Sequence, residues 1–259
     1  MKKINDETIS SIKDLYNSGL SANKVSIILN ISSRTVEKYI KLLGINGRNR
    51  KYILNENYFE KIDSKSKAYL LGYLFSDGNI RNDNNSIKLK IHQKDKHILE
   101  FLKKELDCNY VINVEKNTNC LSLCITSKKM HSDLIKLGCI PSKSLLLKYP
   151  NIEKEYWNSF IHGYFDGDGC IYFAEKNDNR TSQRQFKLLG TNEFLNSVKN
   201  YFNENGIETY DVQKYPKSNI YNLRTCNKKS LNKIFNCFYS DANYIFLDRK
   251  KNIFEKTII

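Results

Sequence analysis

Hydrophobic residues near the N-terminus of this chain recur at helical spacing in three short segments. The segments cover residues 6–18, 22–29 and 33–43. Ser21 and Ser32 stand immediately before the second and third segments, where N-cap residues are expected. Because the connection between these two segments is very short, the pattern predicts a helix-turn-helix domain over residues 1–46.

In a helix-turn-helix domain the third helix enters the major groove of DNA. Its outer face would carry Arg34, Thr35 and Lys38, whose side chains suit base edges and phosphates. A small packing module with a solvated charged face is the alternative interpretation of these three helices.

Residues 47–63 are predicted to form a linker, whose first part is short, basic and poor in apolar residues. The basic side chains there are Arg48, Arg50 and Lys51. We interpret this part as a segment that follows a phosphate backbone. A plain solvated tether is the alternative.

From residue 64 onward, one order of helices and strands is predicted twice. Residues 64–150 alternate between helical and strand-like periodicity in the order helix, two strands, helix, two strands, helix, and residues 151–259 repeat that order. Each copy begins with an apolar helix that contains an internal glycine and ends in Asp-Gly. The interval from Gly72 to Gly163 equals the interval from Asp77 to Asp168, so the second half is a tandem duplicate of the first.

Gly72 and Gly163 each interrupt an apolar helix, where glycine costs about 1 kcal/mol relative to alanine. Glycine has no Cβ and therefore permits a close approach between backbones. Its recurrence predicts that the two helices pack tightly against each other. The segments around both glycines are apolar on nearly all sides, as expected of helices buried between two halves.

Asp77 and Asp168 are charged residues at the ends of these apolar helices. A carboxylate at a helix C-terminus lies at the negative end of the helix dipole, and two such carboxylates side by side repel each other. A divalent cation bound between them would relieve both costs. Oxygen ligands and retained waters suit Mg²⁺, or another divalent cation such as Mn²⁺. One Asp-Gly alone would indicate a turn, whereas two copies at equivalent positions favour a metal site.

Composition and charge narrow the class of partner. The chain of 259 residues has 42 Lys and Arg against 28 Asp and Glu, a net charge of +14, which favours a polyanion such as nucleic acid. A merely basic soluble protein is the alternative on charge alone. No apolar run reaches the roughly 20 residues of a membrane-spanning helix, and the N-terminus lacks a signal-peptide core. We therefore expect a cytoplasmic protein without a membrane partner. The seven cysteines lack the paired spacing of a zinc site.

The two glycine-containing stretches, Leu70–Gly78 and Ile161–Gly169, resemble the motif of the LAGLIDADG (DOD-type) homing endonuclease family, in its single-chain form with two motifs. Both stretches match at the glycine and at the terminal Asp-Gly. The first departs from the family pattern at Phe75, where the family has an aspartate that is not the metal ligand. The resemblance covers about residue 55 to the C-terminus.

This resemblance implies an α+β fold and a function. Two αββαββα repeats would form two saddle-shaped, four-stranded antiparallel sheets, and a long asymmetric DNA duplex would lie along them. The family's chemistry implies that Asp77 and Asp168 hold divalent metal between themselves and the scissile phosphates, where metal-polarised water attacks phosphorus. The expected function is a sequence-specific double-strand endonuclease that acts as a monomer and is encoded by a mobile element, with intron homing as its role.

The family also uses a basic residue near the metal-bound water in each half. The resemblance makes Lys143 the candidate in the first half and Lys250 its counterpart in the second. Both lysines could instead contact phosphates.

Sequence-reading contacts are expected on the outward positions of the strands. In the first half these are Lys88, Lys90 and His92, which alternate with apolar residues. On the corresponding strand of the second half we expect Arg184, Gln185 and Lys187. A solvated sheet face is the alternative.

Other functions on the same scaffold stay open. A regulator that binds DNA without cleavage is one, although the presence of both Asp77 and Asp168 argues against it. An intron maturase that binds intron RNA is another. An intein is disfavoured, because the chain ends in Thr-Ile-Ile259 without His-Asn.

Overall fold

The computed structural model describes residues 4–18, 20–45, 52–141, 146–174, 183–216, 218–242 and 244–258. The chain divides into two compact units, Met1–Lys51 and Tyr52–Ile259. Each unit has a hydrophobic core of its own, so each is described separately.

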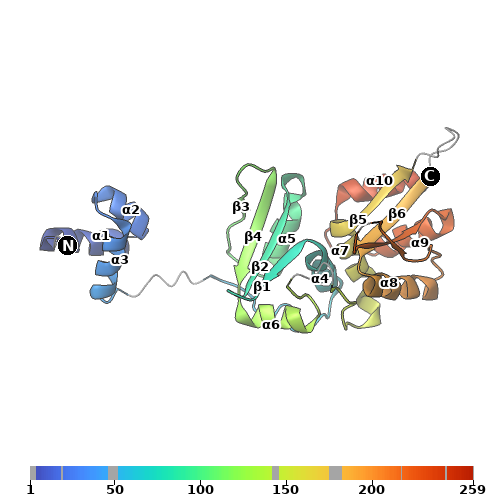
Figure 1. Ribbon diagram of the computed structural model, residues 1–259, viewed down its shortest axis with the longest axis horizontal. Coiled ribbons are helices and arrows are strands. Elements are labelled where there is room, and N and C mark those ends of the chain that lie inside the picture. Colours follow the sequence, from blue (N-terminus) through green and yellow to red (C-terminus); the bar gives the residue numbers. More distant parts are fainter. Residues whose placement is uncertain are drawn as a thin grey trace. The chain divides into compact units, whose positions relative to one another are not determined.

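The first unit contains three helices, α1 (Asp6–Asn17), α2 (Ala22–Ile28) and α3 (Ser33–Leu42) (Figure 1). Its core is built from Ile12, Val25, Val36 and Ile40. The side chains of Ser21 and Ser32 accept hydrogen bonds from the backbone N–H groups of Lys24 and Thr35, as expected of N-caps. The three predicted helices and both predicted caps are therefore present.

The second unit begins at Tyr52, earlier than the predicted end of the linker at residue 63. Tyr58, Phe59 and Ile62 are buried in its core, and the backbone N–H of Asn55 donates to Leu106 O at 2.8 Å. Residues 52–63 are therefore part of the folded unit, because their apolar side chains pack against it. Residues 46–51, the rest of that segment, lie outside the described residues.

The second unit consists of two halves with the same succession of elements. The first half contains α4 (Lys65–Asp77), β1 (Gly78–Arg81), β2 (Ser86–His92), α5 (Lys96–Glu105), β3 (Asn113–Val114), β4 (Cys120–Thr126) and α6 (Lys128–Lys136). The second contains α7 (Trp157–Asp168), β5 (Gly169–Ala174), β6 (Gln183–Gly190), α8 (Asn192–Glu204), β7 (Gln213–Lys214), β8 (Tyr221–Thr225) and α9 (Lys228–Tyr239), followed by α10 (Asp248–Ile258).

Each half forms one four-stranded antiparallel sheet. The strand orders are β1-β2-β4-β3 and β5-β6-β8-β7, so the two sheets have the same topology. Gly78 pairs with Leu89 in the first sheet and Gly169 pairs with Leu188 in the second, so the registers correspond as well. The expected α+β fold with two αββαββα repeats is confirmed. The outer strands β3 and β7 are only two residues long.

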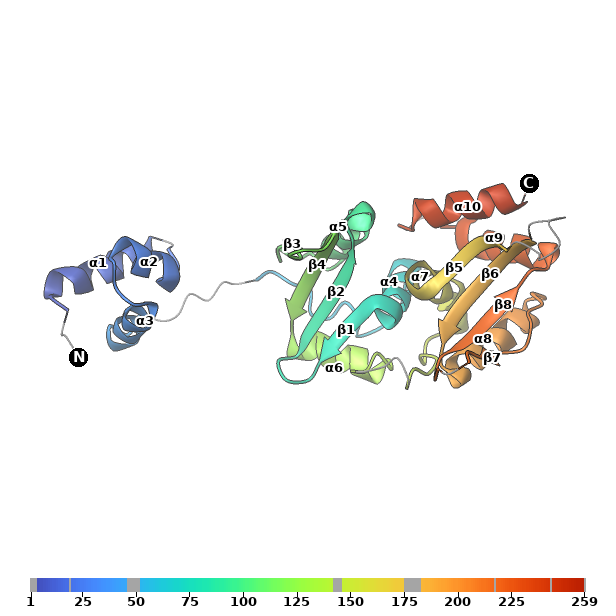
Figure 2. The same ribbon diagram turned by 45° about the horizontal axis from the view of Figure 1, so that its top comes forward.

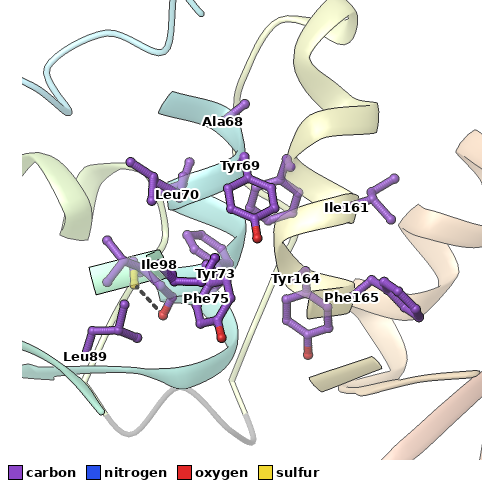
Figure 3. Packing of buried hydrophobic residues seen from close by; sticks show 14 of the residues in the cluster. Ala68, Tyr69, Leu70, Tyr73, Phe75, Leu89, Ile98, Ile161, Tyr164 and Phe165 are labelled. Carbon is purple, nitrogen blue, oxygen red and sulfur yellow. Dashed lines mark hydrogen bonds between the residues drawn. The ribbon is translucent and has the colours of Figure 1, made fainter. Parts of the chain in front are cut away.

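Helices α4 and α7 lie side by side between the two sheets, as both ribbon views show (Figures 1 and 2). Both helices are buried along most of their length, which explains their nearly uniform apolar composition. Figure 3 shows side chains from the two helices, including Tyr69 and Phe75 of α4 and Tyr164 and Phe165 of α7. The core therefore runs continuously from one half to the other.

Helix α10 was not predicted from the sequence. Its helical stripe contains Leu247 just before the helix, then Lys250 and Phe254, all buried. The lysine interrupts the apolar periodicity that would have revealed the helix. Phe254 packs against Phe165 and Phe186, so α10 covers the helix-facing side of the second sheet.

Candidate nucleic-acid interface and metal site

The glycines of the two central helices lie where the backbones of α4 and α7 meet. A Cβ at Gly72 would overlap the carbonyl oxygen of Phe160, and a Cβ at Gly163 would overlap that of Tyr69. Each glycine thus admits a backbone carbonyl of the opposite helix. This close approach brings the C-terminal ends of the two helices together.

Asp77 and Asp168 are the last residues of α4 and α7, and both are exposed. A Cβ at Gly167, next to Asp168, would overlap the Ser76 side chain and lie 3.4 Å from Asp77 Oδ2. Burial is the largest cause of the raised pKa of Tyr164, and the negative charges of Asp168 and Asp77 raise that pKa further. Two carboxylates from different repeats therefore end at neighbouring positions on an accessible surface.

Gly78 and Gly169 follow these aspartates, but neither adopts the left-handed conformation typical of a glycine that ends a helix. Their φ angles are −71° and −89°, and both residues start strands. A Cβ at either position would overlap the preceding turn, at Leu74 O for Gly78 and at Phe165 for Gly169. Glycine is therefore used here for space, which allows a strand to leave the helix directly after the aspartate.

The residues at this site suit a hard divalent cation. Both side chains offer carboxylate oxygens, and Mg²⁺ is commonly held by one or two carboxylates, with waters and substrate phosphates as its other ligands. Among the described residues, no group of three or more His, Cys, Asp or Glu side chains could hold a metal. A metal held by these two carboxylates would take its remaining ligands from water and from a substrate, for which the exposed position leaves room.

Lys250 lies at the C-terminal end of α7 and is 5% exposed. Its ammonium donates three hydrogen bonds to backbone carbonyls, those of Phe165 (2.5 Å), Asp166 (2.8 Å) and Gly169 (2.7 Å). Burial lowers its pKa to about 8. A cation at this position lies at the negative end of the helix dipole and adds a donor to carbonyls in and just after the last turn of α7. Lys143, its predicted counterpart, lies outside the described residues.

A buried polar cluster beside the helix pair was missed by the sequence analysis. Asp166 Oδ2 accepts hydrogen bonds from Tyr69 Oη (2.7 Å) and from the backbone N–H of Leu247 (2.9 Å). Burial raises the pKa of Asp166 to about 6, and burial lowers that of His162 to about 3. Both polar residues interrupt an apolar helix in the sequence, which was the available signal. Asp166 links the two central helices to the start of α10.

One face of each sheet packs against the helices, and we call the other the open face. On the open face of the first sheet lie the side chains of Lys88, Lys90 and His92, because they alternate with the buried Ile87, Leu89 and Ile91. Lys88 Nζ pairs with Glu115 Oε1 at 2.6 Å. Lys90 and His92 are exposed. These three positions therefore share one face, as predicted.

On the open face of the second sheet lie Lys187, which is half-buried, and Gln185, which is buried and donates through Nε2 to Cys226 Sγ. Lys187 Nζ donates to Tyr215 Oη at 2.9 Å and lies over the ring of Tyr172, and the Tyr172 hydroxyl donates to Gln185 Oε1. Arg184, predicted to accompany them, lies on the opposite, helix-facing side. There its guanidinium donates to Lys256 O of α10 at 2.8 Å. Adjacent strand residues point to opposite faces, so Arg184 and Gln185 cannot share one.

In the first unit, the predicted contact residues lie on α3. Arg34 and Lys38 are exposed, whereas Thr35 is half-buried and its hydroxyl is hydrogen-bonded to that of Ser32 at 2.7 Å. Arg48, Arg50 and Lys51 lie outside the described residues. In the part of the chain that the structure describes, no helix is long and apolar enough to span a bilayer.

Residues 155–236 match the family of LAGLIDADG-like domains. Among solved structures, the chain is similar to the LAGLIDADG meganuclease I-AabMI bound to uncleaved DNA, with 15% identity, a TM-score of 0.53 and coverage of 75% of this chain and 88% of that one. It is also similar to the I-LtrWI LAGLIDADG homing endonuclease bound to target DNA, with 13% identity, a TM-score of 0.53 and coverage of 78% of this chain and 89% of that one. A third similar structure is meganuclease I-SmaMI bound to uncleaveable DNA, with 12% identity, a TM-score of 0.53 and coverage of 75% of this chain and 90% of that one. No curated protein matches the chain.

Proposed function

We propose that this chain, which carries a LAGLIDADG-like domain on a LAGLIDADG fold, is a metal-dependent endonuclease that cuts specific sites in double-stranded DNA. One observation carries the proposal: Asp77 and Asp168 end two helices that meet at glycines, and both are exposed. Duplicated sheets with basic residues on their open faces support it, because a duplex could lie along both.

In this proposal Asp77 and Asp168 hold Mg²⁺, or another divalent cation such as Mn²⁺. The bound metal would supply an activated water and stabilise the charge that develops at the phosphate. The protein itself contributes by positioning the two aspartates. Gly72 and Gly163 bring the helix ends together, and the three hydrogen bonds of Lys250 fix the end of α7 from which Asp168 extends. A structure of I-SmaMI on uncleaved target DNA was obtained with calcium ions, which fits a divalent-cation site.

The open faces would then read the target through Lys88, Lys90 and His92 in one half and through Lys187 in the other, where the buried Gln185 would hold Tyr172 beside that lysine. Arg34 and Lys38 of the first unit would extend the footprint, in the manner of a helix-turn-helix domain. With both halves in one chain, the protein would act as a monomer on an asymmetric site, as the product of a mobile element.

The test is cleavage of a randomised or host-derived duplex library in the presence of Mg²⁺. The wild-type protein should produce double-strand cuts at a defined sequence. Asp77→Asn and Asp168→Asn should each reduce cleavage by at least about 100-fold, because loss of supporting groups around a metal already costs 10–100-fold. The matched control is Asp63→Asn. Asp63 is exposed and pairs with Lys67 near the other end of α4, so its loss should leave cleavage unchanged.

Other outcomes identify other functions. Tight, sequence-specific binding without cleavage under any divalent metal would replace the nuclease with a DNA-binding regulator. Saturable binding to intron RNA that promotes its folding would indicate a maturase. Cleavage that persists in both aspartate variants would remove the proposed roles of Asp77 and Asp168.

A further inference from the structure

The open face of the first sheet contains an acidic residue on an otherwise basic surface. Glu115 follows β3, and its backbone N–H donates to Cys120 O at 3.0 Å, which fixes it in the β3–β4 hairpin. Its side chain crosses β4 to reach Lys88 on β2. A carboxylate here would repel the phosphates of a bound duplex. On a DNA-binding surface such a position would weaken general binding to DNA, and a specific contact would offset that cost.

Among the described residues, Glu115 is hydrogen-bonded through one of its two carboxylate oxygens. Oε1 accepts from both Lys88 Nζ and Ser122 Oγ, each at 2.6 Å. Within the described ranges, no side chain or backbone group is found to donate to Oε2. The pair therefore presents a fixed acceptor beside the ammonium donors of Lys88. The exposed fractions of the two side chains, 26% and 36%, leave both within reach of a ligand.

We propose that Glu115 and Lys88 together read one G·C base pair in the major groove. Lys88 would donate to guanine O6 and N7, and Glu115 Oε2 would accept from the N4 amino group of cytosine. An A·T pair would place the thymine methyl against the ion pair and remove its water without a compensating hydrogen bond. The inference rests on the proposed DNA-binding function and assigns Glu115 as a specificity-determining residue.

The second sheet uses different chemistry at the same position. Lys88 pairs with Asn79 in the first register and Lys187 pairs with Cys170 in the second, so the two lysines are equivalent. Lys187 lies between the rings of Tyr172 and Tyr215. Since it has no acidic partner in the described part of the chain, the combined donor and acceptor of the first sheet is not repeated there. The pair should therefore constrain one base pair in one half-site only.

The experiment uses the full chain with Ca²⁺ to select bound duplexes from a randomised library. Competition binding then measures discrimination at every position of the selected site. For the wild type, one base pair in one half-site should be G·C, preferred about tenfold over the alternatives. In Glu115→Ala this preference should be lost, while discrimination elsewhere is unchanged. Lys88→Met should lose discrimination at the same base pair.

Glu100→Ala is the matched control, because it removes the same charge from an exposed ion pair with Lys96 on helix α5. Circular dichroism establishes that each variant is folded. An unchanged discrimination profile in Glu115→Ala would overturn the inference. So would a uniform gain in affinity for all sequences, because Glu115 would then act only by repelling phosphates. If the wild type selects no sequence at all, the proposed function fails together with this inference.

Discussion

The two central helices are equivalent by repeat, yet they differ at the residue two positions before the final aspartate. In α4 this residue is Phe75, whose ring packs edge-on against Phe160 with a centroid distance of 5.1 Å. In α7 it is Asp166, a buried carboxylate held by Tyr69 and by the backbone of Leu247. One position thus serves apolar packing in the first half and a polar anchor in the second.

The difference shows which parts of a duplicated fold are free to change. The glycines must stay, because the opposite backbone occupies the space of a Cβ. The aspartates at the helix ends are also present in both halves. Between them, the side chain has diverged according to what packs beside it, and in the second half that neighbour is the segment leading into α10. The two open faces have diverged in the same way, at Lys88 and Lys187.

The largest expected effect comes from the feature that both helices share. Gly72→Ala and Gly163→Ala should each destabilise the second unit by about 3 kcal/mol or more, because the new Cβ meets a backbone carbonyl that cannot move alone. Urea unfolding measures the loss. Ser66→Ala, in the first turn of α4, is the control and should change stability by less than about 0.5 kcal/mol. A large loss at one glycine and none at the other would contradict the equivalence of the two helices.

Lys250 tests how the end of α7 is held. Lys250→Met should destabilise the second unit by about 3 kcal/mol, because three backbone carbonyls lose the ammonium donor and Phe165 O keeps the N–H of Gly169. Cleavage should fall as well, since the segment before Asp168 loosens. The control is Lys256→Met, which removes an exposed side chain of the same helix. If Lys250→Met abolishes cleavage while urea unfolding is unchanged, the lysine acts in the chemistry and not in positioning.

Substitutions at Asp166 and at Phe75 should differ in how their effect on stability depends on pH. The folded-state pKa of Asp166 is raised from 3.8 to about 6, so its contribution to stability falls as pH rises from about 4 to 6. Asp166→Asn removes this loss. Between pH 4 and pH 7, the free energy of unfolding of the variant should rise relative to that of the wild type by on the order of 2 kcal/mol.

The pH dependence is measured by urea unfolding of both proteins across this range. His162, whose pKa burial lowers to about 3, contributes the opposite slope in the wild type. Phe75→Leu is the matched variant at the equivalent position. It should destabilise by an amount that does not vary with pH. A difference between Asp166→Asn and the wild type that stays flat with pH would count against the buried carboxylate as the cause.

The smallest expected effect separates the two lysines of the open faces. Lys187→Met should weaken binding to an arbitrary duplex and reduce the steepness of its salt dependence by about one unit, because an uncompensated cation is lost. The double variant Lys88→Met, Glu115→Gln removes an ion pair with no net charge and should leave the salt dependence unchanged. Fluorescence anisotropy at several salt concentrations measures both. Equal changes in the salt dependence of the two variants would show that the two sheets do not differ in this respect.

The sequence alone determined much of this fold, because its signals are local. Alternating apolar residues define the strands, serines mark the helix starts, and two Asp-Gly stretches at equal intervals reveal the duplication and the candidate metal ligands Asp77 and Asp168. The separation of Arg184 from Gln185 was also available, since neighbouring strand residues face opposite ways. That error came from the interpretation of the pattern and not from the tertiary structure.

Only the tertiary structure decided how residues distant in sequence pair with one another. The resemblance made Lys250 a basic residue near the metal site, yet its side chain is buried against α7, where its ammonium donates to three backbone carbonyls. The buried Asp166 accepts hydrogen bonds from Tyr69 and from the backbone of Leu247, and Glu115 forms an ion pair with Lys88. No periodicity in the sequence encodes such partners. Only the bond between Tyr69 and Asp166 joins the two repeats, and it depends on the close approach of α4 and α7 at the two glycines.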